Sequence, residues 1–135
     1  MSFVLDNSVA LAWCFSDEQT PAVMGLLDRV AETGATAPLL WPLKALNGLL
    51  AAERRRRVSP EQRVTLAAFL HDLPVTLDAH TAEQAWEATI RLGVHFKLTV
   101  YDAAYLELAQ RRRLPLASLD QDLRAAAKTA GVEIL

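Results

Sequence analysis

The fold of this chain is best approached from the stretch Phe3-Val4-Leu5-Asp6-Asn7-Ser8. Its three apolar residues are typical of a short buried strand, and the strand ends abruptly in polar side chains. Asp6 is therefore expected at the carboxyl edge of a strand. Ligands bind at that edge in open α/β sheets, so Asp6 is the first candidate for a functional residue. A role as a helix cap is the weaker explanation, because Ser8 can cap the following helix itself.

The composition indicates one compact domain, spanning residues 1–135, with 52% hydrophobic residues. No apolar run approaches the roughly 20 residues that span a bilayer, and no basic and then apolar leader opens the chain. We therefore expect a cytoplasmic protein without membrane contact. The net charge of −2 gives no global attraction to nucleic acid. The single cysteine, Cys14, lies among apolar residues and is expected to be an inert buried thiol.

Strand-like and helix-like segments alternate along the chain. Strands are expected near residues 3–5, 35–37, 74–78, 114–119 and 132–135, and helices near 8–14, 20–34, 41–53, 60–71, 81–96, 99–112 and 121–130. The pair Thr20-Pro21 and the capping box Ser59-Pro60-Glu61-Gln62 mark two of the helix starts. The alternation predicts an α/β fold in which a central parallel sheet of about five short strands is flanked by helices.

Three carboxylates are expected to converge at the carboxyl edge of this sheet. Asp6 and Asp120 end two of the strands, and Asp102 lies in the first turn of a helix that begins near the same edge. Each acid after Asp6 also has a purely structural explanation, since Thr99 with Asp102 fits a capping box, Asp120 fits an N-cap, and Asp122 suits a helix dipole.

Carboxylates that converge in this way need a counter-charge. At about 4 Å and an effective dielectric near 20, two of them repel by about 4 kcal/mol, which a divalent cation relieves. Oxygen ligands suit Mg²⁺ or Mn²⁺, and the chain has no cysteine and histidine set that would suit zinc. A metal ion held by acids at a strand edge is typical of phosphodiester hydrolysis.

Two further patterns allow two interpretations each. The arginine runs 54–57 and 111–113 each close a predicted helix, where they are either solvated cations favoured by the helix dipole or contacts for phosphates. A set of apolar residues belongs either to the core or to a groove for an amphipathic partner segment; its members are Trp13, Phe15, Val23, Leu26, Leu27, Leu46, Leu49 and Leu50.

Over essentially its whole length the chain resembles PIN-domain ribonucleases, specifically the VapC-type toxins of bacterial toxin–antitoxin pairs. The resemblance is carried by Phe3-Val4-Leu5-Asp6-Asn7-Ser8, by Trp41-Pro42-Leu43 with Asn47, by Thr99-x-Tyr101-Asp102-Ala103-Ala104-Tyr105, and by Ser118-Leu119-Asp120-x-Asp122-Leu123. It implies a Mg²⁺-dependent endoribonuclease with a parallel sheet, a homodimer that a VapB-type antitoxin silences. By the same resemblance the metal-centred catalytic acids are Asp6, Asp102 and Asp120, the accessory acid is Asp122, and the polar neighbours are Ser8, Asn47 and Thr99.

Lys44 departs from the pattern of the family. Relatives read Trp-Pro-Leu-Glu where this chain has Trp41-Pro42-Leu43-Lys44, and the spacing to Asn47 is preserved. A lysine early in a helix gains nothing from the dipole, so local propensity does not explain it. The change replaces a negative charge by a positive one beside the expected metal, and we expect weaker Mg²⁺ binding and loss of most activity. The ammonium group either neutralises Asp6 and Asp102 in place of the cation or extends into solvent.

Two hypotheses of different classes follow. The first is a metal-dependent endoribonuclease toxin that Lys44 attenuates, with RNA as its substrate. The second is a catalytically dead PIN domain that still dimerises and binds its antitoxin. A receiver or phosphatase domain fits less well, because a phosphatase requires Asp-x-Asp where the chain has Asp6-Asn7-Ser8.

Overall fold

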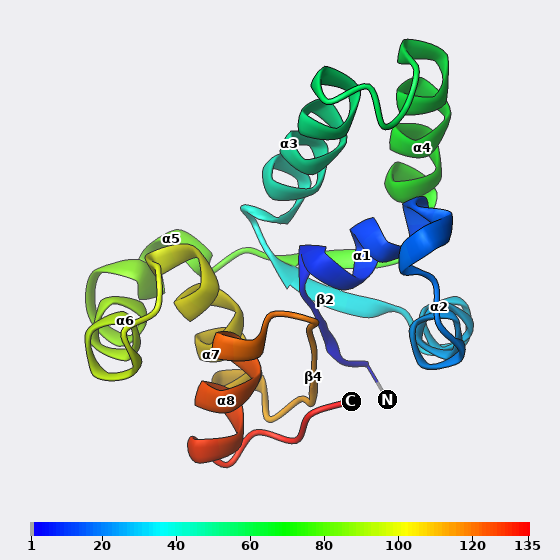
Figure 1. Ribbon diagram of the computed structural model, residues 1–135. Helices are drawn as coiled ribbons and strands as arrows, with labels where there is room; N and C mark the ends of the chain where they lie inside the picture. Colours follow the sequence, from blue (N-terminus) through cyan, green and yellow to red (C-terminus); the bar gives the residue numbers. More distant parts are fainter. Residues whose placement is uncertain (1) are drawn as a thin grey trace.

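The computed structural model describes residues 2–135 and has the expected α/β architecture, with a parallel sheet flanked by helices (Figure 1). The strands β1 (Val4–Leu5), β2 (Ala35–Pro38), β3 (Val75–Asp78) and β4 (Leu116–Ala117) lie side by side in the order β3-β2-β1-β4. The chain places β2 and β3 on one side of β1 and then returns to place β4 on the other. The strand order therefore reverses between β1 and β4, and such a switch point is where open α/β sheets bind ligands.

The expected fifth strand, near residues 132–135, is reduced to two backbone hydrogen bonds beside β4. Leu116 N donates to Glu133 O at 2.9 Å, and Leu135 N donates to Leu116 O at 3.0 Å. The pairing stays confined to Leu116 because its neighbours face β1, where Val4 N donates to Pro115 O at 2.8 Å and Asp6 N donates to Ala117 O at 3.0 Å. Within residues 2–135 the sheet thus has four strands where the sequence predicts about five.

The helices follow the predicted pattern closely. They are α1 (Asn7–Cys14), the 3₁₀ turn η1 (Ser16–Glu18), α2 (Pro21–Thr33), α3 (Trp41–Arg54), α4 (Pro60–Asp72), α5 (Thr81–Gln84), the π-helical turn η2 (Ala85–Thr89), α6 (Ile90–Phe96), α7 (Val100–Arg112) and α8 (Gln121–Thr129). The predicted helix at 81–96 is interrupted by η2, a wider turn of the kind that often marks a functional or strained position. None of the helices between residues 2 and 135 is long and apolar enough to cross a bilayer.

Side-chain caps begin several of these helices as the sequence predicts. Thr20 accepts a hydrogen bond from Val23 N, and Ser59 and Gln62 form a complete capping box. The prediction that Ser8 caps α1 is wrong, because the helix already begins at Asn7 and the Ser8 hydroxyl turns back to Asp6. α1 therefore begins without a side-chain cap, and the Ser8 hydroxyl donates to the Asp6 carboxylate instead.

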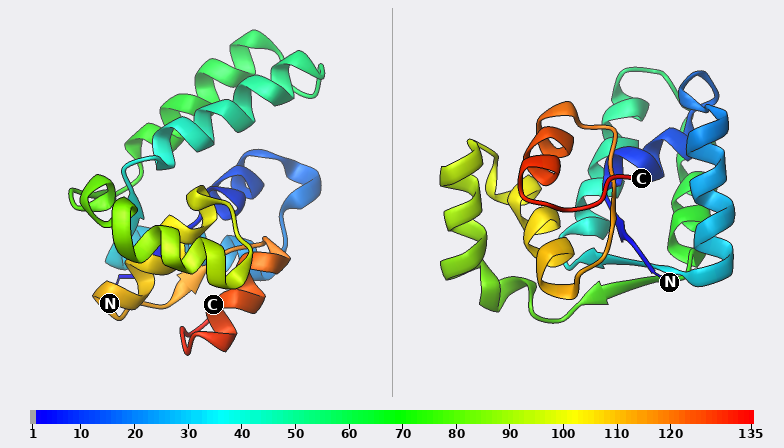
Figure 2. Two further views of the ribbon diagram at one scale, coloured as in Figure 1. Left: turned by 90° about the vertical axis from the view of Figure 1, so that its left-hand side faces the viewer. Right: turned by 90° about the horizontal axis from the view of Figure 1, so that it is seen from below.

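The helices form two groups around the sheet. In the views of Figures 1 and 2, α1 to α4 lie on one side of the molecule and α5 to α8 on the other. The core between them includes fully buried Phe3, Leu5, Leu49 and Tyr105. The α3–α4 hairpin extends beyond the sheet from the edge where β2 ends (Figure 1). The α3–α4 hairpin therefore borders this edge of the sheet on one side, and α5 and α6 border it on the other.

Candidate active site

Asp6 is the most buried carboxylate at the switch point, with 2% of its surface exposed. It directly follows β1, and its backbone N donates to Ala117 O on β4 at 3.0 Å, which fixes the residue between the two strands. Its Oδ2 atom accepts two hydrogen bonds, whereas its Oδ1 atom is buried with no donor among residues 2–135. Burial raises the pKa of Asp6, and the nearby Asp120 charge raises it further against the hydrogen bonds from two serines.

Ser118 completes the surroundings of Asp6, and the sequence reasoning missed its role. Ser8 Oγ donates to Asp6 Oδ2 at 2.6 Å, and Ser118 Oγ, which is almost fully buried, donates to the same oxygen at 2.8 Å. Ser118 Oγ also accepts from Asp120 N at 3.0 Å, so it links the ends of β1 and β4. A small hydroxyl residue directly after an apolar strand, two positions before an acid, is the signal that could have identified it.

Asp102 and Asp120 lie within electrostatic range of Asp6. The pKa of Asp102 is raised by its partial burial first, and then by the charges of Asp120 and Asp6. Asp120 caps α8, since its Oδ1 atom accepts from Leu123 N at 2.9 Å. The structural explanation of Asp120 is therefore confirmed, and the same residue contributes its charge to the acidic group.

The remaining predicted site residues differ in how they relate to this group, and among them only Thr99 bonds to one of its acids. Thr99 caps α7 by accepting from Asp102 N at 3.1 Å, so it positions that acid. Asn47 is exposed on α3, one turn beyond Lys44 and on the same side of the helix. Asp122 is exposed and lines a separate hollow of about 390 Å³ with Phe96 and Lys97.

Lys44 extends over this site from the first turn of α3. Its Nζ atom lies 5.3 Å from the centroid of the Tyr101 ring, and its charge lowers the pKa of Asp102 against the effect of burial. No ion pair joins Lys44 to an acid between residues 2 and 135. The position of Lys44 thus lies between the two alternatives predicted for it: its charge acts on Asp102, but its ammonium group packs on the Tyr101 ring and forms no ion pair with an acid of residues 2–135.

The donor set fits a hard cation in its chemistry. The Asp6 oxygen that has no donor among residues 2–135, together with the Asp6 and Asp102 carboxyls whose pKa values are raised by burial and then by neighbouring acids, is what a divalent ion would satisfy. Within residues 2–135, however, no three acidic, histidine or cysteine side chains are close enough to hold an ion as they stand. The Asp120 carboxylate is turned toward the start of α8, which accounts for part of this spacing.

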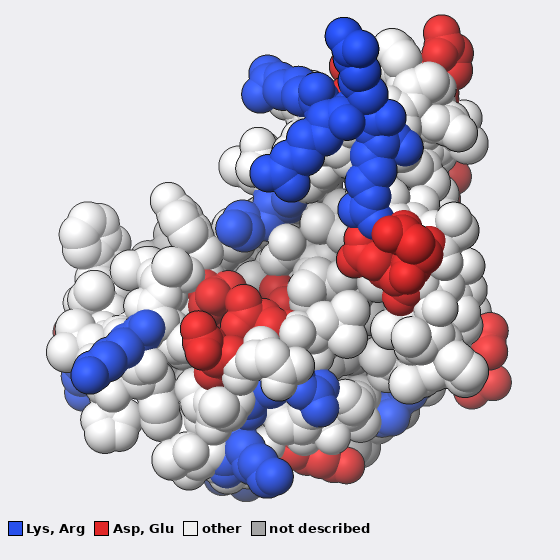
Figure 3. All heavy atoms as spheres, viewed as in Figure 1, with Lys and Arg blue, Asp and Glu red and all other residues white. Residues whose placement is uncertain are grey.

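The surface around the acids is hollowed and sharply divided in charge. Figure 3 shows acidic side chains in a depression at the centre of this face, between the α3–α4 hairpin and α5 with α6. Basic side chains cover the end of the hairpin above them on the same face (Figure 3). A negatively charged centre is therefore next to a positively charged projection.

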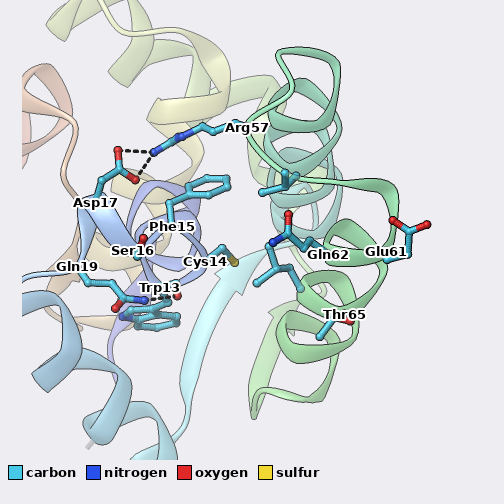
Figure 4. Close-up of a pocket in the computed structure, with 12 residues that line it drawn as sticks. Trp13, Cys14, Phe15, Ser16, Asp17, Gln19, Arg57, Glu61, Gln62 and Thr65 are labelled. Atoms are coloured by element: carbon cyan, nitrogen blue, oxygen red, sulfur yellow. Dashed lines mark hydrogen bonds and ion pairs between the residues drawn. The ribbon is translucent and has the colours of Figure 1, made fainter.

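A second hollow, of about 580 Å³, lies away from the acids between α1, η1 and α4 (Figure 4). Arg57 crosses it, 4.1 Å from the centroid of the Phe15 ring, and pairs with Asp17 at 2.7 Å. Cys14 also lines this hollow; burial raises its pKa to about 11, so its thiol stays protonated and inert. The thiol expected to be buried is thus half-buried.

The apolar residues that allowed two interpretations belong mostly to the core. Trp13, Phe15, Val23 and Leu49 are buried, and Leu26, Leu27 and Leu50 are half-buried. Leu46 alone of the set is exposed, on α3. Core packing therefore explains most of this pattern.

Comparisons with known proteins agree with this architecture. Residues 3–129 match the PIN domain family. The structure of PAE2754 from Pyrobaculum aerophilum is similar with a TM-score of 0.72 and 22% identity, over 99% of this chain and 83% of that one. The VapC20 toxin of Mycobacterium tuberculosis, which cleaves the sarcin–ricin loop, is similar with a TM-score of 0.59 and 20% identity, over 93% of this chain and 95% of that one. No curated protein matches the sequence. Since the family match covers nearly the entire sequence, the chain belongs to the PIN domain family.

Proposed function

We propose that this chain is a VapC-type toxin of a type II toxin–antitoxin pair, a Mg²⁺-dependent endoribonuclease whose activity Lys44 attenuates. PIN domains are generally nucleases that use divalent metal ions. The observation that carries the proposal is the buried Asp6 carboxylate at the switch point, with Asp102 and Asp120 nearby and with one oxygen that no group in residues 2–135 donates to. An RNA substrate and a place in the cytoplasm belong to the same proposal.

The proposed roles follow from the contacts of each residue. Asp6, Asp102 and Asp120 would hold Mg²⁺, which when bound lowers the pKa of a water molecule and stabilises charge on the scissile phosphate. Ser8 and Ser118 orient Asp6 through its Oδ2 atom, which leaves Oδ1 for the cation. Asn47, Thr99 and Asp122 are proposed as accessory residues, of which Thr99 acts by positioning Asp102.

Attenuation follows from the charge of Lys44. An ammonium group whose field reaches Asp102 opposes a second cation at the same carboxylate. The same observation favours a second candidate function, in which the chain is a catalytically dead PIN domain that acts as an antitoxin-binding module. Both candidates share one fold and one set of partners, and they differ only in residual hydrolysis.

The proposed partners are a VapB-type antitoxin and a second copy of the chain. An apolar stripe on η2 and α6 supports the homodimer, because Trp86, Ile90 and Val94 recur every four residues and Trp86 is 85% exposed. The 580 Å³ hollow beside α1 and α4 is the proposed place for an antitoxin side chain, since it combines the Phe15 ring with polar groups.

Restoring the family acid tests the proposal. Purified wild type and Lys44→Glu are incubated with structured RNA in Mg²⁺ and in EDTA, with Lys44→Gln as the control that removes charge without adding an acid. We expect weak Mg²⁺-dependent cleavage by wild type and cleavage at least about tenfold faster by Lys44→Glu. A wild type with no cleavage beside an active Lys44→Glu supports the dead-module candidate. If Lys44→Glu is equally inert, the nuclease proposal is wrong.

A further inference from the structure

The end of the α3–α4 hairpin carries a run of three exposed arginines. Arg54, Arg55 and Arg56 are exposed, and none of them forms an ion pair with any residue from 2 to 135. The next basic residues along the chain are engaged in ion pairs: Arg57 pairs with Asp17 and Glu18, each at 2.7 Å, and Arg63 pairs with Glu53. We call Arg54, Arg55 and Arg56 the arginine tip.

The backbone of the tip makes the identity of Arg56 informative. Arg56 has a φ of 59°, its N–H donates to Glu53 O at 2.9 Å, and Arg57 N donates to Ala52 O at 2.8 Å. This pair of bonds is a Schellman motif, whose left-handed position strongly favours glycine. Arg54 and Arg55 already supply cations to the end of the helix dipole. The backbone at position 56 therefore does not require an arginine, and the exposed Arg56 side chain remains available to bind a ligand.

One face of α3 runs from Lys44, near the acidic site, to the arginine tip. Lys44, Asn47, Ala51, Arg54 and Arg55 recur at helical spacing, so they lie on one side of the helix. The ten residues from Lys44 to Arg54 correspond to about 15 Å along the axis. Figure 3 shows the basic hairpin end and the acidic depression on the same face of the molecule.

The second arginine run is placed differently. Arg111 is engaged by Asp78 and Glu107, and so it is part of the fold. Arg113 has a φ of 54° and ends α7 in the same Schellman motif as Arg56, with Leu114 N donating to Ala109 O at 3.0 Å. Because residues 114 and 115 lead into the start of β4, Arg113 lies at the amino edge of the sheet, opposite the acids. Arg113 therefore has the charge and the left-handed backbone conformation of Arg56, but it lies at the opposite edge of the sheet from the acids.

We propose that the arginine tip is a phosphate-binding clamp, which holds the backbone of an RNA a few nucleotides away from the acidic site. The proposal rests on the proposed nuclease function and deepens it. Guanidinium groups pair with phosphate oxygens through two parallel hydrogen bonds, which suits a row of closely spaced arginines to a nucleic-acid strand. One strand of B-form DNA rises about 3.4 Å per phosphate, so on the same scale the 15 Å of α3 corresponds to a few nucleotides of a nucleic-acid strand. The chain has a net charge of −2, so this local cluster must supply the attraction.

Fluorescence anisotropy with a labelled 20-nucleotide RNA hairpin tests the clamp, in EDTA so that the RNA stays intact and across a series of salt concentrations. The triple variant Arg54→Gln, Arg55→Gln, Arg56→Gly is expected to bind at least about tenfold more weakly, and its slope of log affinity against log salt falls by about 2. Arg56→Gly alone places the favoured residue in the left-handed position, so it should keep or raise the melting temperature while binding RNA roughly threefold more weakly. The matched control Arg113→Gly should leave RNA binding unchanged.

Three outcomes overturn the clamp, of which the first two are unchanged binding in the triple variant and an equal loss in Arg113→Gly. Displacement of the labelled RNA by polyglutamate as effectively as by unlabelled RNA, at equal charge concentration, also overturns it in favour of an acidic polypeptide. Cleavage by Lys44→Glu is scored separately. If Lys44→Glu cleaves RNA but the triple variant binds RNA as the wild type does, only the clamp is refuted. If the triple variant binds more weakly but Lys44→Glu does not cleave, only the nuclease proposal is refuted.

Discussion

The Lys44 ammonium group lies 5.3 Å from the centroid of the Tyr101 ring, and Tyr101 is the residue that directly precedes Asp102. This contact draws the lysine to the rim of the acidic group while its charge still lowers the pKa of Asp102. A cation–π contact of this kind contributes about 0.5–1 kcal/mol at an exposed position. Lys44 is thus held at the site, where its charge opposes that of an added cation.

Lys44→Glu is therefore expected to strengthen binding of Mg²⁺ or Mn²⁺ by about tenfold or more, because it removes a repelling charge and adds a ligand. Isothermal titration calorimetry in the absence of RNA measures this directly. Lys44→Gln should show an intermediate affinity. Equal affinities of all three proteins would contradict the charge argument.

Asp6→Asn should stabilise the metal-free protein, because the buried carboxylate has a raised pKa. A carboxyl group whose pKa is higher in the folded state binds its proton more tightly there, so its ionisation at neutral pH destabilises the fold. We expect the melting temperature at pH 7.5 in EDTA to rise by roughly 3 °C, with the difference shrinking as the pH falls and Asp6 is protonated in the wild type. Added Mg²⁺ should raise the melting temperature of the wild type more than that of the variant.

Ser118→Ala removes a buried hydroxyl that donates to Asp6 and accepts from Asp120 N. The loss should cost about 1–3 kcal/mol of unfolding free energy, because both partners are left with an unmet hydrogen bond. Urea denaturation measures the change. Ser16→Ala, at an exposed serine of η1, is the control with the same change in chemistry. A difference of less than a few tenths of a kcal/mol between the two variants would show that Ser118 does not support Asp6.

Arg111→Met should destabilise the fold by about 3–5 kcal/mol, because it leaves Asp78 and Glu107 buried without their counter-charge. Burial raises the pKa of Asp78, but the hydrogen bonds and charge of Arg111 outweigh it, so the pKa lies below its ordinary value of 3.8. The stabilisation is thus fully present above that value and is lost as the pH falls through the lower folded pKa. Denaturation at pH 7 and pH 3 should therefore show a smaller difference at pH 3. The exposed neighbour Arg112→Met should lose little at either pH.

Trp86→Ser should weaken the proposed homodimer, since an indole that is 85% exposed would be buried between two copies. Sedimentation velocity over a range of protein concentrations is expected to show a dissociation constant raised by tenfold or more, that is about 1.4 kcal/mol or more of lost association energy. Val64→Ser, at an exposed apolar position on α4, is the control. A monomeric wild type, or an unchanged dimer in the Trp86 variant, would exclude this surface.

The sequence by itself determined the α/β class, nearly all helix boundaries and the position of Asp6 at a strand end. These features depend on local rules, because apolar periodicity and capping residues such as Thr20 and Ser59 act within a few positions of the chain. The match to the PIN domain family agrees with that local pattern.

Only the tertiary structure decided which side chains meet across elements. Ser118 reaches Asp6 from 112 positions away in the sequence, Arg111 is engaged by Asp78, and Lys44 rests on Tyr101. The order β3-β2-β1-β4 accounts for the first of these contacts, since it places the ends of β1 and β4 side by side, and the other two depend on where α3 and α7 pack. Such contacts depend on strand order and helix direction, which local spacing does not encode, and so Phe3-Val4-Leu5-Asp6-Asn7-Ser8 predicts the edge of the site but not the residues that face it.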